Sequence, residues 1–136
     1  MRFEVEGLVR GKGRPRFVRT GGNAYTPRLS EHYENWIRWN AAAAIRGQPP
    51  LSGPLSIKVE AELSVPQSWS PKKRKAALSG ELRPEVRPDF DNIAKIVADA
   101  LSGICYWDDK QICTAVFVKR YAEEPRLVVE INEIGP

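Results

Sequence analysis

The feature that most constrains the fold is a strictly alternating segment in the middle of the chain. From residue 55 to 65, apolar side chains occupy every second position: Leu55, Ile57, Val59, Ala61, Leu63 and Val65. Successive side chains of a strand point to opposite faces, so this period of two predicts a β-strand with one buried face. The chain has 136 residues, the usual size of one domain. We therefore expect a single domain, residues 1–136, built around a sheet.

The N-terminal part predicts a strand, a basic loop and a helix. Residues 2–9 alternate like a half-buried strand, and residues 10–28 form a loop rich in glycine and arginine without any acidic residue. Ser30 is a candidate N-cap for the helix that follows, and Gly47 ends that helix. Apolar residues at helical spacing, Trp36 among them, give this helix one buried face.

The C-terminal part predicts two more helices and two more strands. A short helix begins at Ser70–Pro71 and ends near Gly80, and a longer one runs from about Asp91 to Gly103. Strands are expected over residues 111–120 and 127–134, joined by a loop of hairpin length. The fold class is therefore α/β (α+β), with one mixed sheet packed by helices.

Composition excludes several classes of protein. The chain has 42% hydrophobic and 28% charged residues, as globular domains do, and a net charge of only +4. Its two cysteines and single histidine do not form a metal-binding pattern, so we expect reduced thiols in a cytoplasmic protein. Without an apolar stretch of about 20 residues, no membrane span and no membrane partner are expected.

The most informative segment contains two aspartates around a phenylalanine. Asp89 and Asp91 flank Phe90, and Pro88 favours an extended backbone until the next helix begins. In extended chain, residues two apart point the same way, so both carboxylates can face one cation. The alternative is structural, with Asp91 as an N-cap and Asp89 near the positive end of the helix.

A second acidic pair and a lysine extend this pattern. Asp108 and Asp109 follow the helix, and on their own they indicate a turn. If the chain doubles back after Gly103, either residue can join Asp89 and Asp91 beside the basic loop. Lys95 lies one helical turn after Asp91, where an ammonium can neutralise a phosphate, or simply pair with Asp91 or Asp99.

These residues resemble a known family. The segment RPDFDNIAKIVADALSGICYWDDKQI, residues 87–112, is similar in order and spacing to the motif of the RusA family of Holliday-junction resolvases from bacteria and their phages. The resemblance implies a RusA-like endodeoxyribonuclease that resolves four-way junctions by paired nicks in DNA recombination and repair. It implies a homodimer that uses Mg²⁺, with Mn²⁺ as an alternative ion. Asp89, Asp91 and Asp109 match the metal-binding carboxylates, and Lys95 matches the catalytic lysine.

Two basic segments are candidates for DNA binding. They are the loop with Lys12, Arg14, Arg16 and Arg19, and the helical run Lys72, Lys73, Arg74 and Lys75. Contacts of this kind hold phosphates without reading sequence. The alternative for the helical run is a solvated helix face. Trp69 and Trp107 are either packing residues or platforms for unpaired bases.

Two other functions remain open from the sequence. One is a metal-dependent nuclease or phosphatase that acts on flaps or simple duplexes, since its carboxylate cluster would look the same. The other is a non-catalytic module that binds branched or single-stranded DNA, with the aspartates serving as caps and turns.

Overall fold

The alternating central segment forms a strand, as predicted, and it is an inner strand of a four-stranded sheet. The computed structural model describes residues 1–13, 16–17, 24–25 and 28–135. Strands β1 (Arg2–Glu6), β4 (Leu55–Ser64), β5 (Ile112–Ala122) and β6 (Arg126–Glu133) are arranged in the order β1-β6-β4-β5. Only the β4–β5 pair among them is parallel, so the sheet is mixed, as the sequence indicated.

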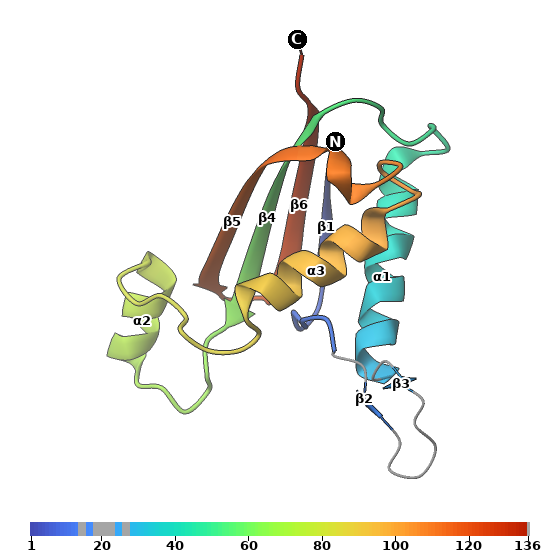
Figure 1. Cartoon of the computed structure of the whole chain (residues 1–136). Helices are drawn as coiled ribbons and strands as arrows, with labels where there is room; N and C mark the ends of the chain where they lie inside the picture. The colour runs from blue at the N-terminus through green and yellow to red at the C-terminus, as the bar shows by residue number, and fades with distance from the viewer. Residues whose placement is uncertain (14–15, 18–23, 26–27, 136) are drawn as a thin grey trace.

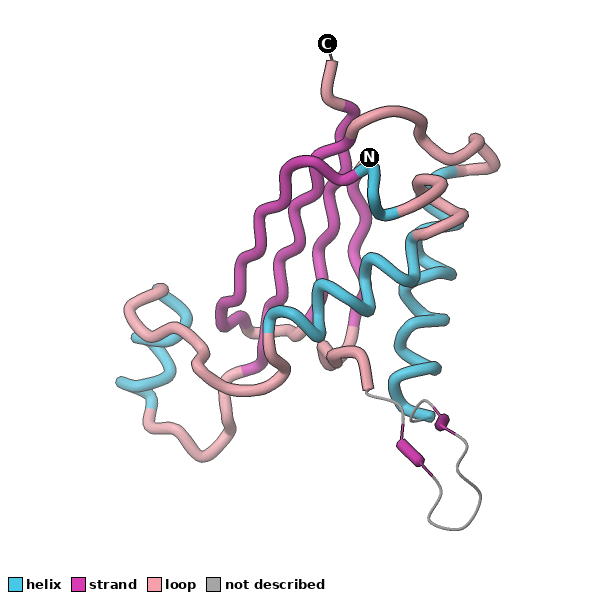
Figure 2. Tube along the Cα trace, viewed as in Figure 1, coloured by secondary structure: helices cyan, strands magenta, loops and turns pink. Residues whose placement is uncertain are grey.

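The parallel β4–β5 pair explains why two helices lie between these strands in the chain. For β5 to run parallel to β4, the chain must return to the end of the sheet where β4 begins. It does so here through α2 (Pro71–Ser79) and α3 (Phe90–Leu101). Figures 1 and 2 show α3 crossing the strands, with α1 (Arg28–Ile45) beside it. The helix α1 packs against both α3 and β1.

The core lies between the sheet and the helices α1 and α3. It contains the alternating residues of β4 and the apolar stripe of α3, namely Ile93, Ile96, Val97, Ala100 and Leu101. The intervening residues of β4, at even-numbered positions, face away from the helices. One of them, Glu62, is the one buried charged residue of β4 among the described residues. Glu62 accepts hydrogen bonds from Arg126 at 3.0 Å and from Arg120 at 3.4 Å, which satisfy the buried carboxylate.

The predicted ends of α2 are confirmed. Ser70 is its N-cap and accepts from the backbone N–H of Lys73, Pro71 opens the helix, and Gly80 ends it with a φ of 89°. This positive φ suits glycine, which has no Cβ to clash.

Three sequence predictions are corrected by the structure. Ser30 is not an N-cap, because α1 already begins at Arg28, and its buried hydroxyl accepts from Gly13 N instead. Trp36 is not a core residue: its side chain is 43% exposed and stacks on Trp39, because it lies at the margin of the buried face. The predicted loop over residues 10–28 contains a short ribbon of β2 (Arg16–Phe17) and β3 (Ala24–Tyr25). None of the described helices combines the length and the hydropathy that a membrane crossing requires.

Candidate functional site

The start of α3 places Asp89 and Asp91 at the surface. Asp89 is the N-cap residue with extended backbone, and its side chain makes no capping hydrogen bond. Asp91 lies in the first helical turn, and one of its carboxylate oxygens accepts from the N–H of Asn92 at 2.9 Å. The helix begins at Phe90, so the two aspartates are not on one extended stretch as predicted. They remain neighbours because one lies just before the first turn and the other within it.

A basic segment packs directly against this helix start. The backbone N–H of Lys12 donates to the carbonyl of Asn92 at 2.8 Å. A Cβ added to Gly11 would lie 2.7 Å from the Cβ of Asn92 and 3.3 Å from that of Pro88, so only glycine fits this contact. The result is a pocket of about 720 Å³ whose lining includes Arg10, Arg87 and Asp89. We predicted a site of three or four carboxylates beside the basic loop, and of these carboxylates Asp89 is the one that lines this pocket.

Arg10 belongs to the basic loop that was predicted to bind phosphates, whereas Arg87 was not predicted as a DNA-binding residue. Both are exposed and line the pocket together with Asp89. The sequence signal for Arg87 is its position two residues before Asp89, with Pro88 between them. The guanidinium group suits phosphate because it donates several hydrogen bonds in one plane.

Lys12 has a different environment from that of a surface phosphate contact. Its ammonium lies 2.5 Å from a carboxylate oxygen of Glu34 on α1 and 3.4 Å from one of Asp99 on α3. Burial alone would lower the pKa of Lys12, but the hydrogen bond and charge of Glu34, with those of Asp99, raise it above the ordinary value. Lys12 thus joins two helices in this structure.

Lys95 lies on the outer face of α3. Its side chain is 63% exposed, and its ammonium is 3.6 Å from Asp99, one turn further along the helix. This is one of the two ion pairs that the sequence allowed as an alternative. Asp91 and Lys95 are both exposed, so the lysine can still reach a group bound beside the aspartates.

The second acidic pair lies beyond the other end of α3. Asp108 caps a short 3₁₀ turn, η1 (Asp109–Gln111), and accepts from the N–H of Lys110 at 2.9 Å. This backbone hydrogen bond lowers the pKa of Asp108. Because Asp108 forms a reciprocal capping box with Gln111, the turn interpretation holds for it, which leaves Asp109 as the better candidate ligand.

A single copy does not bring the two acidic pairs together. Asp89 precedes α3 and Asp109 follows it, and a helix of twelve residues is about 18 Å long. The connecting loop is held to the last turns of α3, where the Tyr106 hydroxyl donates to the carbonyl of Ala98 at 2.9 Å. Within the described ranges, the structure has no group of three or more His, Cys, Asp or Glu side chains able to hold a metal.

The remaining candidates for DNA binding fall into two groups. Lys72, Lys73 and Lys75 are exposed on α2, with Arg74 half-buried, and the Lys73 ammonium lies 4.1 Å from the ring centroid of Trp69. Trp69 also packs edge-on against Tyr121, so packing is its role here, whereas Trp107 is 61% exposed. Arg14 and Arg19 lie outside the described residues, as does the side chain of Arg16.

The two cysteines are free thiols, as expected. Cys105 is buried, which raises its pKa to about 11, and Cys113 is exposed on β5.

Comparison with known proteins gives two findings. A family model described as "Endodeoxyribonuclease RusA" matches residues 6–132. A relative from Bacillus subtilis (strain 168), "Uncharacterized protein YqaN", is 35% identical over 139 residues, which covers 99% of this chain and 97% of that protein.

Proposed function

Because this chain belongs to the endodeoxyribonuclease RusA family, we propose that it is a magnesium-dependent endonuclease that resolves four-way DNA junctions by paired nicks. The observation that supports this most directly is the pocket beside α3. It combines an exposed carboxylate, Asp89, with two arginines, Arg10 and Arg87. A carboxylate and two guanidinium groups in one exposed pocket suit a phosphodiester and its metal ion better than they suit an apolar ligand.

The donor set at the start of α3 fits magnesium. Mg²⁺ prefers carboxylate oxygens, keeps several waters and is commonly held by only one or two carboxylates. Asp89 has no capping hydrogen bond, and Asp91 uses one oxygen for Asn92, so donor oxygens remain on both. When bound there, the ion would lower the pKa of a coordinated water and polarise the phosphoryl oxygens.

The rest of the chemistry belongs to side chains of this chain. Arg10 and Arg87 would bind and orient the phosphate at the pocket, since both guanidinium groups are exposed there. Lys95 would offset negative charge that develops on the phosphate, from its exposed position one turn beyond Asp91. The lysines of α2 lie at the same end of the molecule as the start of α3 (Figure 1), where they would hold a neighbouring arm of the junction.

A homodimer would match the symmetry of the substrate. A four-way junction has near two-fold symmetry, and a two-fold dimer presents two equal sites to opposed strands. It would also offer a place for Asp109, which one copy keeps at the far end of α3 from Asp89 and Asp91. We propose that Asp109 acts beside the aspartate pair of the second copy.

The test is cleavage of a labelled synthetic four-way junction with Mg²⁺, Mn²⁺ or EDTA. Wild type should produce symmetric nicks only with a divalent ion, and Asp91→Asn should bind the junction without cutting it. Asn keeps the oxygen that accepts from Asn92, so the helix start stays folded. The matched control is Glu133→Gln, which removes one exposed negative charge at the end of β6 and should cut normally.

Two outcomes would refute the proposal. Tight binding by wild type without cutting, over several junction sequences and both metal ions, would identify a non-catalytic binding module. Cutting of flaps or linear duplexes as fast as junctions would identify a nuclease of a different specificity.

A further inference from the structure

The edge of the sheet at β5 is open along much of its length. In the part of the chain that the structure describes, β5 is the last strand of the sheet and pairs only with β4. Its other side presents a row of backbone N–H and C=O groups. Such an edge pairs readily with another strand, so monomeric proteins protect it with charges, proline, bulges or a covering segment.

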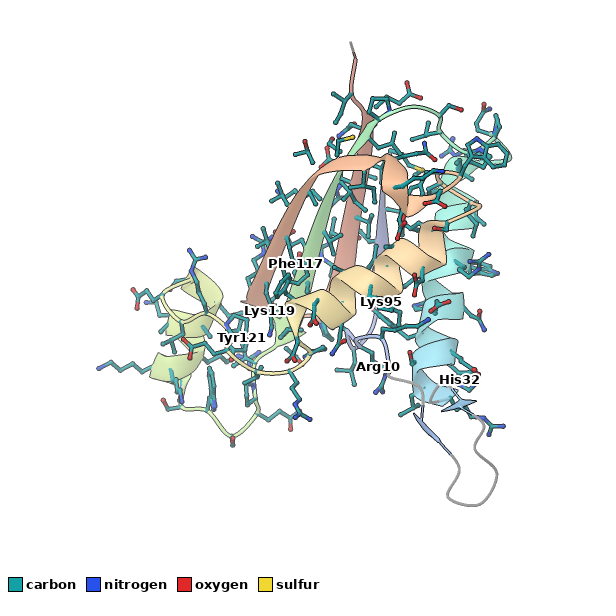
Figure 3. The ribbon with its side chains drawn as sticks, in the orientation of Figure 1. Arg10, His32, Lys95, Phe117, Lys119 and Tyr121 are labelled. Carbon is teal, nitrogen blue, oxygen red and sulfur yellow. The ribbon has the colours of Figure 1, made fainter. Side chains whose placement is uncertain are left out.

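The far end of β5 is protected in one of these ways. The helix α2 contacts β5, Trp69 packs against Tyr121, and the Lys119 ammonium donates to the carbonyl of Val86. Figure 3 shows Phe117, Lys119 and Tyr121 in order along the strand toward this covered end. The open stretch is therefore Ile112–Val118.

The open stretch has one bulge-like register shift, at Cys113, because Ile112 pairs with Leu55 and Thr114 with Ser56. From Thr114 onward it has none of the usual protection. Its sequence, ICTAVFV, contains no charge and no proline. Cys113, Thr114, Ala115 and Val116 are all exposed, with Val116 at 49%. Beside it, Phe90 is 64% exposed and rests on Phe117 at a ring-centroid distance of 6.0 Å. An uncharged apolar edge with an exposed aromatic pair indicates an interface between proteins.

A second copy of the same strand fits this edge. In antiparallel pairs related by a two-fold axis, the axis passes beside one residue, which then faces its own copy. Placed at Ala115, in the regular part of the open stretch, the axis pairs Thr114 with Val116 and brings Cys113, at the register shift, near Phe117. Every pair is uncharged, and the small Ala115 side chains meet at the axis. The antiparallel arrangement also sets Asp108, Asp109 and Lys110 of one copy (net −1) near Lys119 and Arg120 of the other (+2).

We propose that two copies of this protein pair through their β5 edges, antiparallel about Ala115, to form one continuous sheet. This rests on the homodimer of the proposed function and specifies its interface. Phe117 contacts Phe90, the residue between Asp89 and Asp91, and would lie near Cys113 of the second copy. The turn with Asp109 directly precedes the β5 of that copy, so pairing brings it toward the aspartate pair.

The register can be tested by disulfide trapping. In a Cys113→Ser background, Ala115→Cys places two thiols directly opposite each other, with Cα atoms about 4.5–5.5 Å apart, within the range of a disulfide. Thr114→Cys is the control, because its two copies are offset by two residues, about 6.6 Å along the strand. Cys105 is buried and should not react.

Mild oxidation should give a covalent dimer of Ala115→Cys but not of Thr114→Cys. Trapping of Thr114→Cys instead would overturn the assigned axis. A protein that sediments as a dimer, yet traps at neither position, would overturn the β5 interface.

A second variant separates the interface from the nuclease activity. Ala115→Lys should sediment as a monomer, because two ammonium groups would meet at the axis, and it should keep its fold because Ala115 is exposed in one copy. The control is Ile134→Lys, an exposed apolar residue (36%) beyond the end of β6. If Ala115→Lys stays dimeric, the interface is wrong, whatever its nicking activity. If wild type is a β5-linked dimer that cuts no junction, the interface stands and the proposed function fails.

Discussion

Replacing Lys12 by methionine should destabilise the fold without weakening DNA binding. Methionine keeps the length of the side chain and removes its charge. The ammonium of Lys12 joins Glu34 on α1 to Asp99 on α3, and the side chains of the three residues are 20%, 22% and 33% exposed. The variant therefore leaves two half-buried carboxylates without this partner.

The expected cost follows from these exposures. A hydrogen bond to a charged group contributes about 1.5–3 kcal/mol when buried, and an exposed ion pair contributes about 0.2–1 kcal/mol. Partial exposure places Lys12 between these limits, at about 1–2 kcal/mol. For a domain of this size, that loss corresponds to a fall in Tm of roughly 4–8 °C. Lys58→Met, an exposed lysine of β4, is the control and should leave Tm unchanged.

The pH dependence has a definite sign. Because the folded state raises the pKa of Lys12, its contribution is fully present below the ordinary value of 10.5 and is lost as pH rises through the folded-state pKa. The difference in unfolding free energy between wild type and Lys12→Met should therefore stay constant at neutral pH and shrink in strong alkali.

The salt dependence of DNA binding can refute this prediction for Lys12. Each phosphate contact adds about 0.9 to the slope of log affinity against log salt concentration. Arg10→Met should lower that slope for a four-way junction, whereas Lys12→Met should not. An unchanged Tm together with a lower slope for Lys12→Met would show that Lys12 binds phosphate and that its ion pairs contribute nothing.

Three further predictions follow from the same structure. Lys95→Met should slow nicking of a saturating junction. It should lower the free energy of unfolding by no more than about 0.5 kcal/mol, the contribution of an exposed ion pair, and unchanged nicking would show that Lys95 is only a surface ion-pair residue. Replacing Lys72–Lys75 by glutamine should lower the salt slope of junction binding, and an unchanged slope would identify a merely solvated helix face. Glu62→Gln should cost about 1–3 kcal/mol in urea unfolding. Burial raises the pKa of Glu62, but Arg126 and Arg120 outweigh it and hold the pKa below its ordinary 4.5. The difference in unfolding free energy between wild type and Glu62→Gln should therefore vanish as pH falls through the folded-state pKa. A difference that persisted in strong acid would contradict this.

Local patterns predicted most of the elements correctly. The alternation over residues 55–65 matches β4, and Ser70–Pro71 with Gly80 matches the bounds of α2, because these signals depend on residues within a few positions of each other. The proximity of Asp89 and Asp91 is local in the same way, although their backbone is not extended as expected.

The error at Trp36 and the ion pairs of Lys12, which no pattern predicted, concern contacts between distant parts of the chain. Trp36 has helical spacing with the core residues, but its ring is exposed and stacks on Trp39. Lys12 belongs to an arginine-rich segment in the sequence, yet its partners are 22 and 87 residues away. Spacing cannot predict either result, because both depend on where α1 and α3 pack.

The sequence by itself determined the order of the four strands of the main sheet and of the helices α1, α2 and α3, the motif of aspartates and Lys95, and, through its resemblance, the family of this protein. Periodicity and motif spacing are encoded within short stretches, so they can be read without coordinates. Only the tertiary structure decided that Arg10 and Arg87 flank Asp89, that α3 separates Asp89 from Asp109, and that β5 has an open edge. These are long-range consequences of packing two helices on a mixed sheet, and no local pattern specifies them.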